Sequence, residues 1–212
     1  MSDQVRIPPW VGDLNSFRLW ACSEEFPQHG WISFLKGKLL IDFSNEALSH
    51  NQMKGTYSSV LGLIVKESLL GHFLGPRMFL TNLRVLFSTE PDAIFVSNES
   101  LKSGKVIFER GDDSTEVLGS PDMVLEVVSK NSVTKDTEIL GDLYWQAGIS
   151  EYWLVDARGE ELSFEILRHT ASKYVTNKKQ SGWVESAVFG KSFKLTRESN
   201  WHGVSEYNLL VR

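Results

Sequence analysis

Three carboxylates near the middle of the chain have the residue types and the spacing of a divalent-cation site. Two Pro-Asp pairs, Pro91-Asp92 and Pro121-Asp122, each lead directly into a run with strand character, and Glu126 lies within the second run. Hard cations such as Mg²⁺ and Mn²⁺ prefer oxygen ligands and often take one or two protein carboxylates together with waters and substrate phosphates. If the two runs are adjacent strands, Asp92, Asp122 and Glu126 could supply that set.

Glu126 is the most informative of these residues, because it interrupts an apolar run. Alternate side chains of a strand lie on the same face. Glu126 would therefore share its face with Asp122, Val124, Val128 and, if the strand is long enough, Lys130. A carboxylate in such a run is costly to bury unless a cation or hydrogen-bond donors neutralise it. The simpler interpretation is a solvated place on an edge strand or an ion pair with Lys130. The nearby Asp92 and Asp122 favour the cation site.

Other common catalytic chemistries have little support in the sequence. The five histidines form no His-x-x-x-His pair, and the single Cys22 cannot build a zinc cage. Gly190-Lys191-Ser192 resembles the end of a phosphate-binding loop, but Glu185 stands where that loop needs glycine. The sequence contains neither a Gly-x-Ser-x-Gly elbow nor a Gly-x-Gly-x-x-Gly fingerprint. Serine hydrolysis and dinucleotide chemistry are therefore not expected.

Several short motifs occur together in a specific order. They are Pro91-Asp92, GSPDMVLEVVS at 119–129, Lys135-Asp136, Tyr144, Ala147-Gly148 and EYWLVD at 151–156. In this order they resemble the Uma-type family of putative restriction endonucleases, part of the PD-(D/E)XK nuclease superfamily, over about residues 46–167. The resemblance implies an α/β fold of the restriction-endonuclease type, with a central mixed sheet, a hairpin that carries the acids and a helix on each side.

The resemblance also implies roles for individual residues. Asp92, Asp122 and Glu126 would bind Mg²⁺ or Mn²⁺, with the backbone carbonyl of Val127 as a further ligand. A lysine would orient or deprotonate the water that attacks phosphorus in a DNA phosphodiester. The implied partner is therefore DNA, and because superfamily members commonly pair, a homodimer is also expected.

The chain departs from the family pattern at the lysine. Val128 stands at the usual place two residues after the glutamate, and Leu140 stands at the alternative place four residues after Asp136. The remaining candidates are Lys130 and Lys135, each of which is equally interpretable as a solvated lysine. Three hypotheses therefore remain: a metal-dependent endonuclease, a nuclease-fold module that binds DNA or a protein without turnover, and a hydrolase that uses the same metal on another substrate.

Three further polar residues have both a functional and a simpler interpretation. His50 stands where the family often has a histidine, although a lone histidine near a helix end is more often a surface or capping residue. Glu46 could complete the acid set, but an acid favoured by the helix dipole in the first turn is simpler. Asp136 is predicted to cap a helix, with support of the site as the alternative.

The elements that must position these residues follow from apolar periodicity. Helical spacing is expected in three segments: 14–22, 46–70 and 132–147. Strands are expected at 31–34 and 39–43 around Lys36-Gly37, then at 78–81, 84–88, 93–97, 105–110, 123–128, 152–155 and 162–167. The aromatic residues near the motifs are expected to pack helix against sheet: Tyr144, Tyr152 and Trp153. The chain is predicted to be one domain, residues 1–212, comprising an N-terminal arm and hairpin (1–45), a nuclease-like core (46–170) and a C-terminal extension (171–212).

Composition sets the outer limits. With 212 residues, 42% of them hydrophobic, the chain can bury a core, so disordered and disulfide-stapled classes are excluded. No apolar run approaches the roughly 20 residues that cross a bilayer, and Met1–Gln4 lacks a basic or apolar leader, which predicts a cytoplasmic protein. A net charge of -5 argues against tight, sequence-independent DNA binding. Part of that charge falls on the proposed metal ligands, where a cation would offset it.

Overall fold

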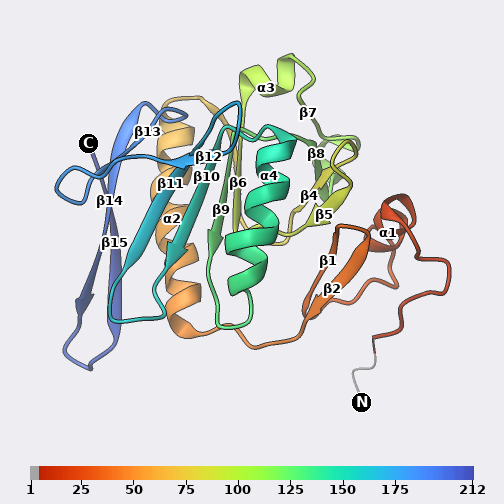
Figure 1. The fold of residues 1–212 in the computed structure, drawn as a ribbon, viewed down its shortest axis with the longest axis horizontal. Coiled ribbons are helices and arrows are strands. Elements are labelled where there is room, and N and C mark those ends of the chain that lie inside the picture. The colour runs from red at the N-terminus through yellow and green to blue at the C-terminus, as the bar shows by residue number, and fades with distance from the viewer. Residues whose placement is uncertain (1–4) are drawn as a thin grey trace.

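Residues 5–212 are described by a computed structural model, in which helices cover both faces of a central sheet (Figure 1). The first four residues of the predicted N-terminal arm, including the leader region considered above, lie outside the described part. Within residues 5–212, no helix is long and apolar enough to span a membrane. The predicted division into one domain with two arms stays a prediction.

The central sheet is mixed, as expected for an α/β fold of this type. Its strand order is β12 (Tyr174–Thr176), β11 (Ser163–His169), β10 (Glu151–Asp156), β9 (Met123–Val127), β6 (Ala93–Ser97) and β3 (Gly71–Leu74). Strands β9 and β10 are parallel and the other neighbours are antiparallel. Strand β9 is therefore internal, so the solvated edge position considered for Glu126 does not occur.

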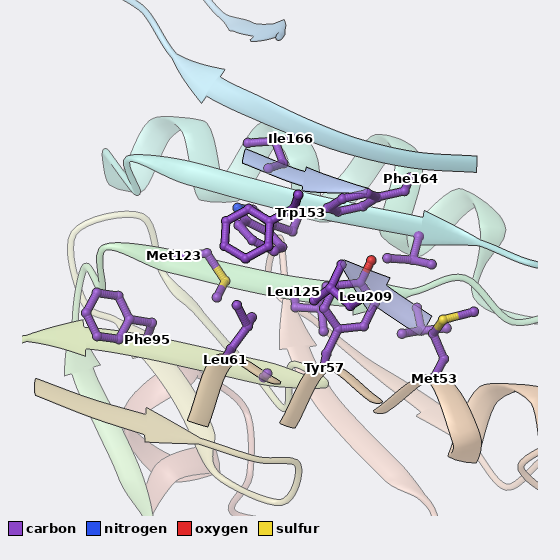
Figure 2. Close-up of a cluster of buried hydrophobic side chains, with 14 of the residues drawn as sticks. Met53, Tyr57, Leu61, Phe95, Met123, Leu125, Trp153, Phe164, Ile166 and Leu209 are labelled. Atoms are coloured by element: carbon purple, nitrogen blue, oxygen red, sulfur yellow. The ribbon is translucent and has the colours of Figure 1, made fainter. Parts of the chain in front are cut away.

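The side chains of β9 alternate between two cores, which confirms the predicted parity. Met123, Leu125 and Val127 pack against α2 (Leu48–Glu67) and the C-terminal strands, and Figure 2 shows these contacts around Tyr57 and Trp153. On the other face the apolar side chains of β9 and β6 pack against α4 (Gly141–Ala147). Burial of both faces explains why β9 reads as a nearly continuous apolar run.

A second mixed sheet carries the N-terminal arm. Its strand order is β2 (Lys38–Asp42), β1 (Trp31–Leu35), β5 (Phe87–Thr89), β4 (Phe79–Asn82), β8 (Glu116–Gly119) and β7 (Val106–Ile107). Helix α1 (Leu14–Ala21), capped by Asp13, buries Phe17 and Trp20 against this sheet. Arg18 of α1 forms an ion pair with Glu116 of β8, which fastens the helix to the sheet.

The C-terminal extension forms a third sheet of β13 (Val184–Ser186), β14 (Lys191–Ser199) and β15 (Ser205–Val211), at the opposite end of the molecule from α1 (Figure 1). The Thr56 hydroxyl of α2 donates to the Tyr207 carbonyl of β15 at 3.2 Å. Glu151, at the start of β10, accepts hydrogen bonds from residues 186–188. The extension is thereby fixed to both the long helix and the central sheet.

Several predicted elements differ from those observed. The strand predicted at 84–88 begins only at Phe87, in β5, because residues 83–86 form a turn in which the Asn82 side chain accepts from the backbone N–H groups of Arg84 (3.1 Å) and Val85 (3.0 Å). The strand predicted at 105–110 is reduced to Val106–Ile107, and two short helices were not predicted: α3 (Asn98–Lys102) and the 3₁₀ turn η1 (Gly111–Asp113). The predicted helix at 132–147 begins as a π-helical segment, η2 (Lys135–Leu140), before it continues as α4. The hairpin at Lys36-Gly37 is confirmed, with φ of 50° and 76° at these two residues.

Candidate active site

Glu126 is buried within the central sheet on the face that packs against α4. Only 2% of the residue is exposed, and its Oε1 accepts a hydrogen bond from the Tyr144 hydroxyl of α4 at 2.7 Å. Burial raises the pKa of Glu126 well above its ordinary value; the positive charge of Lys135 opposes this shift, while the charges of Asp136 and Asp92 add to it. A carboxylate in this position is ready to accept a cation or a proton.

Asp92 lies at the start of β6, beside the end of β9. Its backbone N–H donates to the Leu125 carbonyl at 3.1 Å, and its Oδ2 accepts from the backbone N–H of Val127 at 2.7 Å. The Pro91-Asp92 pair thus brings a second carboxylate to the residue that follows Glu126. The register of β6 and β9, in which Ala93 pairs with Leu125, places the two acids on adjacent strands. The two strands do not form the predicted hairpin, because α3, β7 (Val106–Ile107) and β8 lie between them in the chain.

The beginning of α2 contributes a row of polar side chains at intervals of four residues. His50 Nε2 lies 2.7 Å from the Val127 carbonyl and 3.5 Å from Asp92 Oδ2, and its Nδ1 lies 2.5 Å from Glu46 Oε1. Lys54 forms an ion pair with Glu46, and its Nζ lies 3.7 Å from Asp92 Oδ1. His50 and Lys54 lie on one face of α2 because they are four residues apart. Glu46 precedes the helix, so the interpretation as a first-turn acid is wrong, and it joins this face through its contacts with His50 and Lys54.

The charge states of this row follow from its contacts. Burial opposes protonation of His50, but Asp92 and Glu46 outweigh burial and raise its pKa. Both ring nitrogens face acceptors, and only the doubly protonated imidazolium donates from both. Burial also opposes ionisation of Glu46, yet its pKa is lowered because Lys54 and His50 donate to it. The row is therefore an internally neutralised network that holds Asp92.

Lys135 enters the site from the first residue of η2. Ser129 and Ser132 hydrogen bond to each other and turn the chain directly after β9, so η2 begins beside the acids. The Lys135 Nζ lies 3.3 Å from Asp136 Oδ1, and the side chain of Lys135 is 19% exposed. Burial opposes its charge, but Glu126, Asp136 and Asp92 raise the pKa of Lys135 above the ordinary lysine value. Lys135 therefore stays protonated at neutral pH.

Asp136 lies in the site rather than at a helix cap. It is buried, and its Oδ1 receives no hydrogen bond from any residue within 5–212 beyond the ion pair with Lys135. Burial raises the pKa of Asp136, while Lys135 acts in the opposite direction. The capping role predicted for Asp136 is wrong; the side chain belongs to the acid cluster.

Two of the predicted catalytic residues are not brought to this cluster. Asp122 precedes Glu126 by four residues along β9, a distance of about 13 Å, and its carboxylate accepts from the Ser97 N–H (2.7 Å) and the Ser100 hydroxyl (2.9 Å) at the start of α3. Lys130 is exposed in the loop after β9 and forms no ion pair with Glu126. Asp122 thus has a structural role, and the ion pair considered between Glu126 and Lys130 does not form.

The two positions where the family pattern has a lysine are occupied by buried apolar side chains. Val128 is 3% exposed and Leu140 is fully buried, and Leu140 packs in the core beneath α4. His50, for which a surface or capping role was the simpler prediction, lies against Asp92, and Glu46 contacts His50 and Lys54 rather than the acids themselves. Lys54 was not predicted as a site residue. The four-residue spacing of these three residues in a predicted helix was the available signal, but only the packing of α2 shows which face it serves.

The donor atoms at this end of β9 fit a hard divalent cation. The carboxylates of Asp92 and Glu126 and the Val127 carbonyl are oxygen ligands of the kind that Mg²⁺ and Mn²⁺ prefer. One ligand atom from each of Glu46, His50 and Asp92 also lies within 4.8 Å of the others, but the imidazolium form of His50 has no lone pair for a metal, so this group supports Asp92 and does not form a second cation site. Glu126 accepts a hydrogen bond from Tyr144 alone, and Asp136 Oδ1 has a free acceptor site. The site thus has more acceptor capacity than the described residues satisfy.

Comparisons with known proteins were made against families, curated proteins and solved structures. Residues 20–197 match the family model Uma2, described as a putative restriction endonuclease. A crystal structure of a putative nuclease belonging to DUF820 from Anabaena variabilis ATCC 29413 is similar with a TM-score of 0.61 at 15% sequence identity, covering 84% of this chain and 90% of that one. At this identity the likeness shows the fold alone. No curated protein matches the sequence.

Proposed function

The chain belongs to the Uma2 family of putative restriction endonucleases, and we propose that it is a metal-dependent endonuclease that hydrolyses phosphodiester bonds of DNA. The observation that carries this proposal is the convergence of Asp92, Glu126 and Lys135 in one buried cluster. Glu126 is buried, its pKa is raised and Lys135 is its charge partner, which is the combination that marks a candidate catalytic group.

Asp92, Glu126 and the Val127 carbonyl would hold Mg²⁺ or Mn²⁺. When bound, such a cation supplies Lewis-acid stabilisation of the negative charge that develops during phosphodiester hydrolysis. Glu46, His50 and Lys54 position Asp92 from α2, because their network contacts both its carboxylate oxygens. The Tyr144 hydroxyl holds one oxygen of Glu126 in the same way.

Lys135 acts as a cation and hydrogen-bond donor in this proposal. Because the surrounding acids keep its ammonium group protonated, it does not take a proton from the attacking water. Its N–H groups instead orient that water and the phosphate oxygens. Of the two roles expected for the family lysine, orientation is therefore the one that we assign to Lys135.

The test is nicking of supercoiled plasmid by the purified chain with Mg²⁺ or Mn²⁺, and with EDTA. We expect metal-dependent nicking that the double variant Asp92→Ala/Glu126→Ala abolishes. Asp122→Asn is the matched control, because it removes a charge from β9 at a position outside the cluster. Wild type that nicks no faster than the double variant would overturn the proposal.

The absence of a lysine at positions 128 and 140 favours one alternative function. With Val128 and Leu140 buried, the chain could retain the fold and bind DNA or a protein partner without turnover. Saturable binding of labelled DNA in fluorescence anisotropy, with no product under any metal condition, would support this alternative. Efficient cleavage would exclude it.

Two further proposals accompany the nuclease function. A homodimer is supported by the exposed apolar side chains on and after the edge strand β2, namely Leu40, Ile41 and Phe43. Light scattering during size exclusion would show a mass of one or two chains. A cytoplasmic location, where DNA is accessible, is proposed with the substrate and is testable by cell fractionation.

A further inference from the structure

A cleft of about 500 Å³ opens beside the acid cluster. One wall is the segment that leads into β1, including Trp31, and the opposite wall is α2, including Asn51, Lys54 and Gly55. Arg77, in the turn before β4, closes one end. The cleft therefore lies between the N-terminal arm and the helix that supports Asp92.

Lys54 connects the cleft to the site. Its side chain lines the cleft, forms an ion pair with Glu46 at the same wall, and lies 3.7 Å from Asp92 at the Nζ atom. A nucleic-acid strand with a phosphate at Asp92 and Glu126 would therefore have the cleft next to that phosphate.

Arg77 fixes the arm wall relative to the acids. Its guanidinium donates to the carbonyls of Gly30 (2.8 Å) and Gln28 (2.6 Å) and lies 3.3 Å from Glu90, two residues before Asp92. Arg77 adopts a φ of 75°, a left-handed backbone conformation that is strained for a residue with a side chain. The contacts of Arg77 with Gly30, Gln28 and Glu90 hold this strained conformation, and they also keep the cleft in a preformed shape.

Gly55 keeps the helix wall open. It lies in the interior of α2, where glycine is less favourable than alanine. A Cβ atom built there would meet no atom within 4 Å among the described residues outside its helix, so packing does not require glycine. The absence of a side chain leaves the helix backbone accessible to a ligand that approaches closely.

The lining matches the chemistry of an unpaired nucleotide strand. Lys54 and Arg77 place positive charge at the cleft walls, although each is paired with a carboxylate, Glu46 and Glu90 respectively. The Asn51 amide and the Ser58 hydroxyl offer neutral donors for phosphate and sugar oxygens, and Trp31 offers an aromatic ring for base stacking. A space of this size takes about one or two nucleotides, and a duplex is too wide to enter it.

We propose that this cleft binds a single-stranded segment of the DNA substrate next to the bond that is cut, with the N-terminal arm as one wall of the path. This inference rests on the proposed nuclease function and names its substrate class. DNA with a single-stranded extension is accordingly preferred over blunt duplex.

The experiment fills the cleft and measures binding apart from cleavage. Fluorescein-labelled blunt duplex, and the same duplex with a short single-stranded extension at either end, are titrated in fluorescence anisotropy with Ca²⁺ replacing Mg²⁺. Wild type and the control Leu63→Trp, which adds a tryptophan at an exposed position of α2 outside the cleft, are expected to bind an extended duplex at least about tenfold more tightly than the blunt one. Gly55→Trp should lose this preference. Ser58→Trp fills the same space from another position, and thermal melting checks that each variant is folded.

The outcomes separate this inference from the proposed function. A preference for extended DNA that survives in both folded cleft variants, Gly55→Trp and Ser58→Trp, or a loss as large in Leu63→Trp, would overturn the role of the cleft. Plasmid nicking by wild type without any preference for extensions would overturn the inference and leave the nuclease function standing. A cleft-dependent preference without nicking would support the inference for binding and contradict cleavage.

Discussion

Glu126 and Glu151 lie on the adjacent parallel strands β9 and β10, and they are exposed by only 2% and 1%. Glu151 accepts hydrogen bonds from Trp153 Nε1 (2.9 Å), the Ser186 hydroxyl (2.6 Å) and the N–H groups of Ala187 (2.7 Å) and Val188 (3.2 Å). Glu126 accepts one, from Tyr144, and faces other acids.

The difference teaches that burial by itself does not mark a functional carboxylate. Glu126 interrupts the apolar strand β9 and Glu151 begins the apolar strand β10, and both lost their water shell when the chain folded. The fold replaces that shell with four donors at Glu151, which makes it a structural anchor for the C-terminal extension. At Glu126 the replacement is incomplete, and the remaining acceptor capacity is what a cation would use.

The largest effect is expected when the two glutamates are exchanged for glutamine and compared in plasmid nicking. Glu126→Gln keeps the shape but removes the charge that would hold the metal, so nicking should fall by about 10²-fold or more. Glu151→Gln should nick at nearly the wild-type rate per folded molecule. Equal losses in both variants would erase the functional difference between the two sites.

A second comparison tests Lys135, whose positive charge opposes the rise in the pKa of Glu126. Lys135→Met should lower the nicking rate by about 10- to 100-fold, because it removes the cation that orients water and phosphate. Lys130→Met is the matched control, since Lys130 is exposed in the preceding loop. If Lys130→Met has the larger effect, the assignment of Lys135 is wrong.

The free energy of unfolding should show the opposite order, with a larger loss in Glu151→Gln than in Glu126→Gln. Glu151→Gln should lower the free energy of unfolding by about 2 kcal/mol. Both carboxylate oxygens of Glu151 accept hydrogen bonds, and the NH₂ group of glutamine cannot replace either oxygen as an acceptor. Glu126→Gln should be neutral or stabilising in the absence of metal, since it removes a poorly solvated charge. Urea denaturation in EDTA measures both, and a larger loss in Glu126→Gln would contradict the comparison.

The smallest effect concerns pH. Because burial raises the folded-state pKa of Glu126 above its ordinary value of 4.5, the folded chain holds this proton more tightly than the unfolded chain. Metal-free stability should therefore fall as the pH rises above about 4.5 toward the folded-state pKa. Asp136 contributes with the same sign. The decline should be shallower in Glu126→Gln, and identical slopes from pH 4.5 to 8 would count against the raised pKa.

Much of the central sheet could be predicted from the sequence, because local patterns decide it. The alternation in 122–128 gave the correct faces of β9, and the Pro-Asp pair placed Asp92 beside Glu126. The same alternation also put Asp122 in the site, because parity identifies a face but says nothing of distance along the strand. Four residues of extended chain separate Asp122 from Glu126, which is too far for a shared cation.

The rest of the site depends on contacts between distant segments. Glu46, His50 and Lys54 meet the acids only because α2 packs its neighbouring stripe of Met53, Tyr57 and Leu61 onto β9, as Figure 2 shows. The burial of Leu140 likewise follows from the orientation of η2 and α4. Helical periodicity predicts which residues share a face of a helix, but it does not predict how that helix packs on the sheet. The sequence patterns therefore gave candidate site residues without selecting among them.

The π-helical segment η2 also bears on how this site tolerates changes in chain length. A π-helical turn holds one residue more than an α-helical turn, so the chain before it is out of phase with the helix after it. Deleting one residue within 137–139 would restore α-helical phase and rotate Lys135 by about 100° about the axis, away from Glu126. The lysine is thus held in register by an inserted residue, and a relative without that insertion would need its cation at a different helix position.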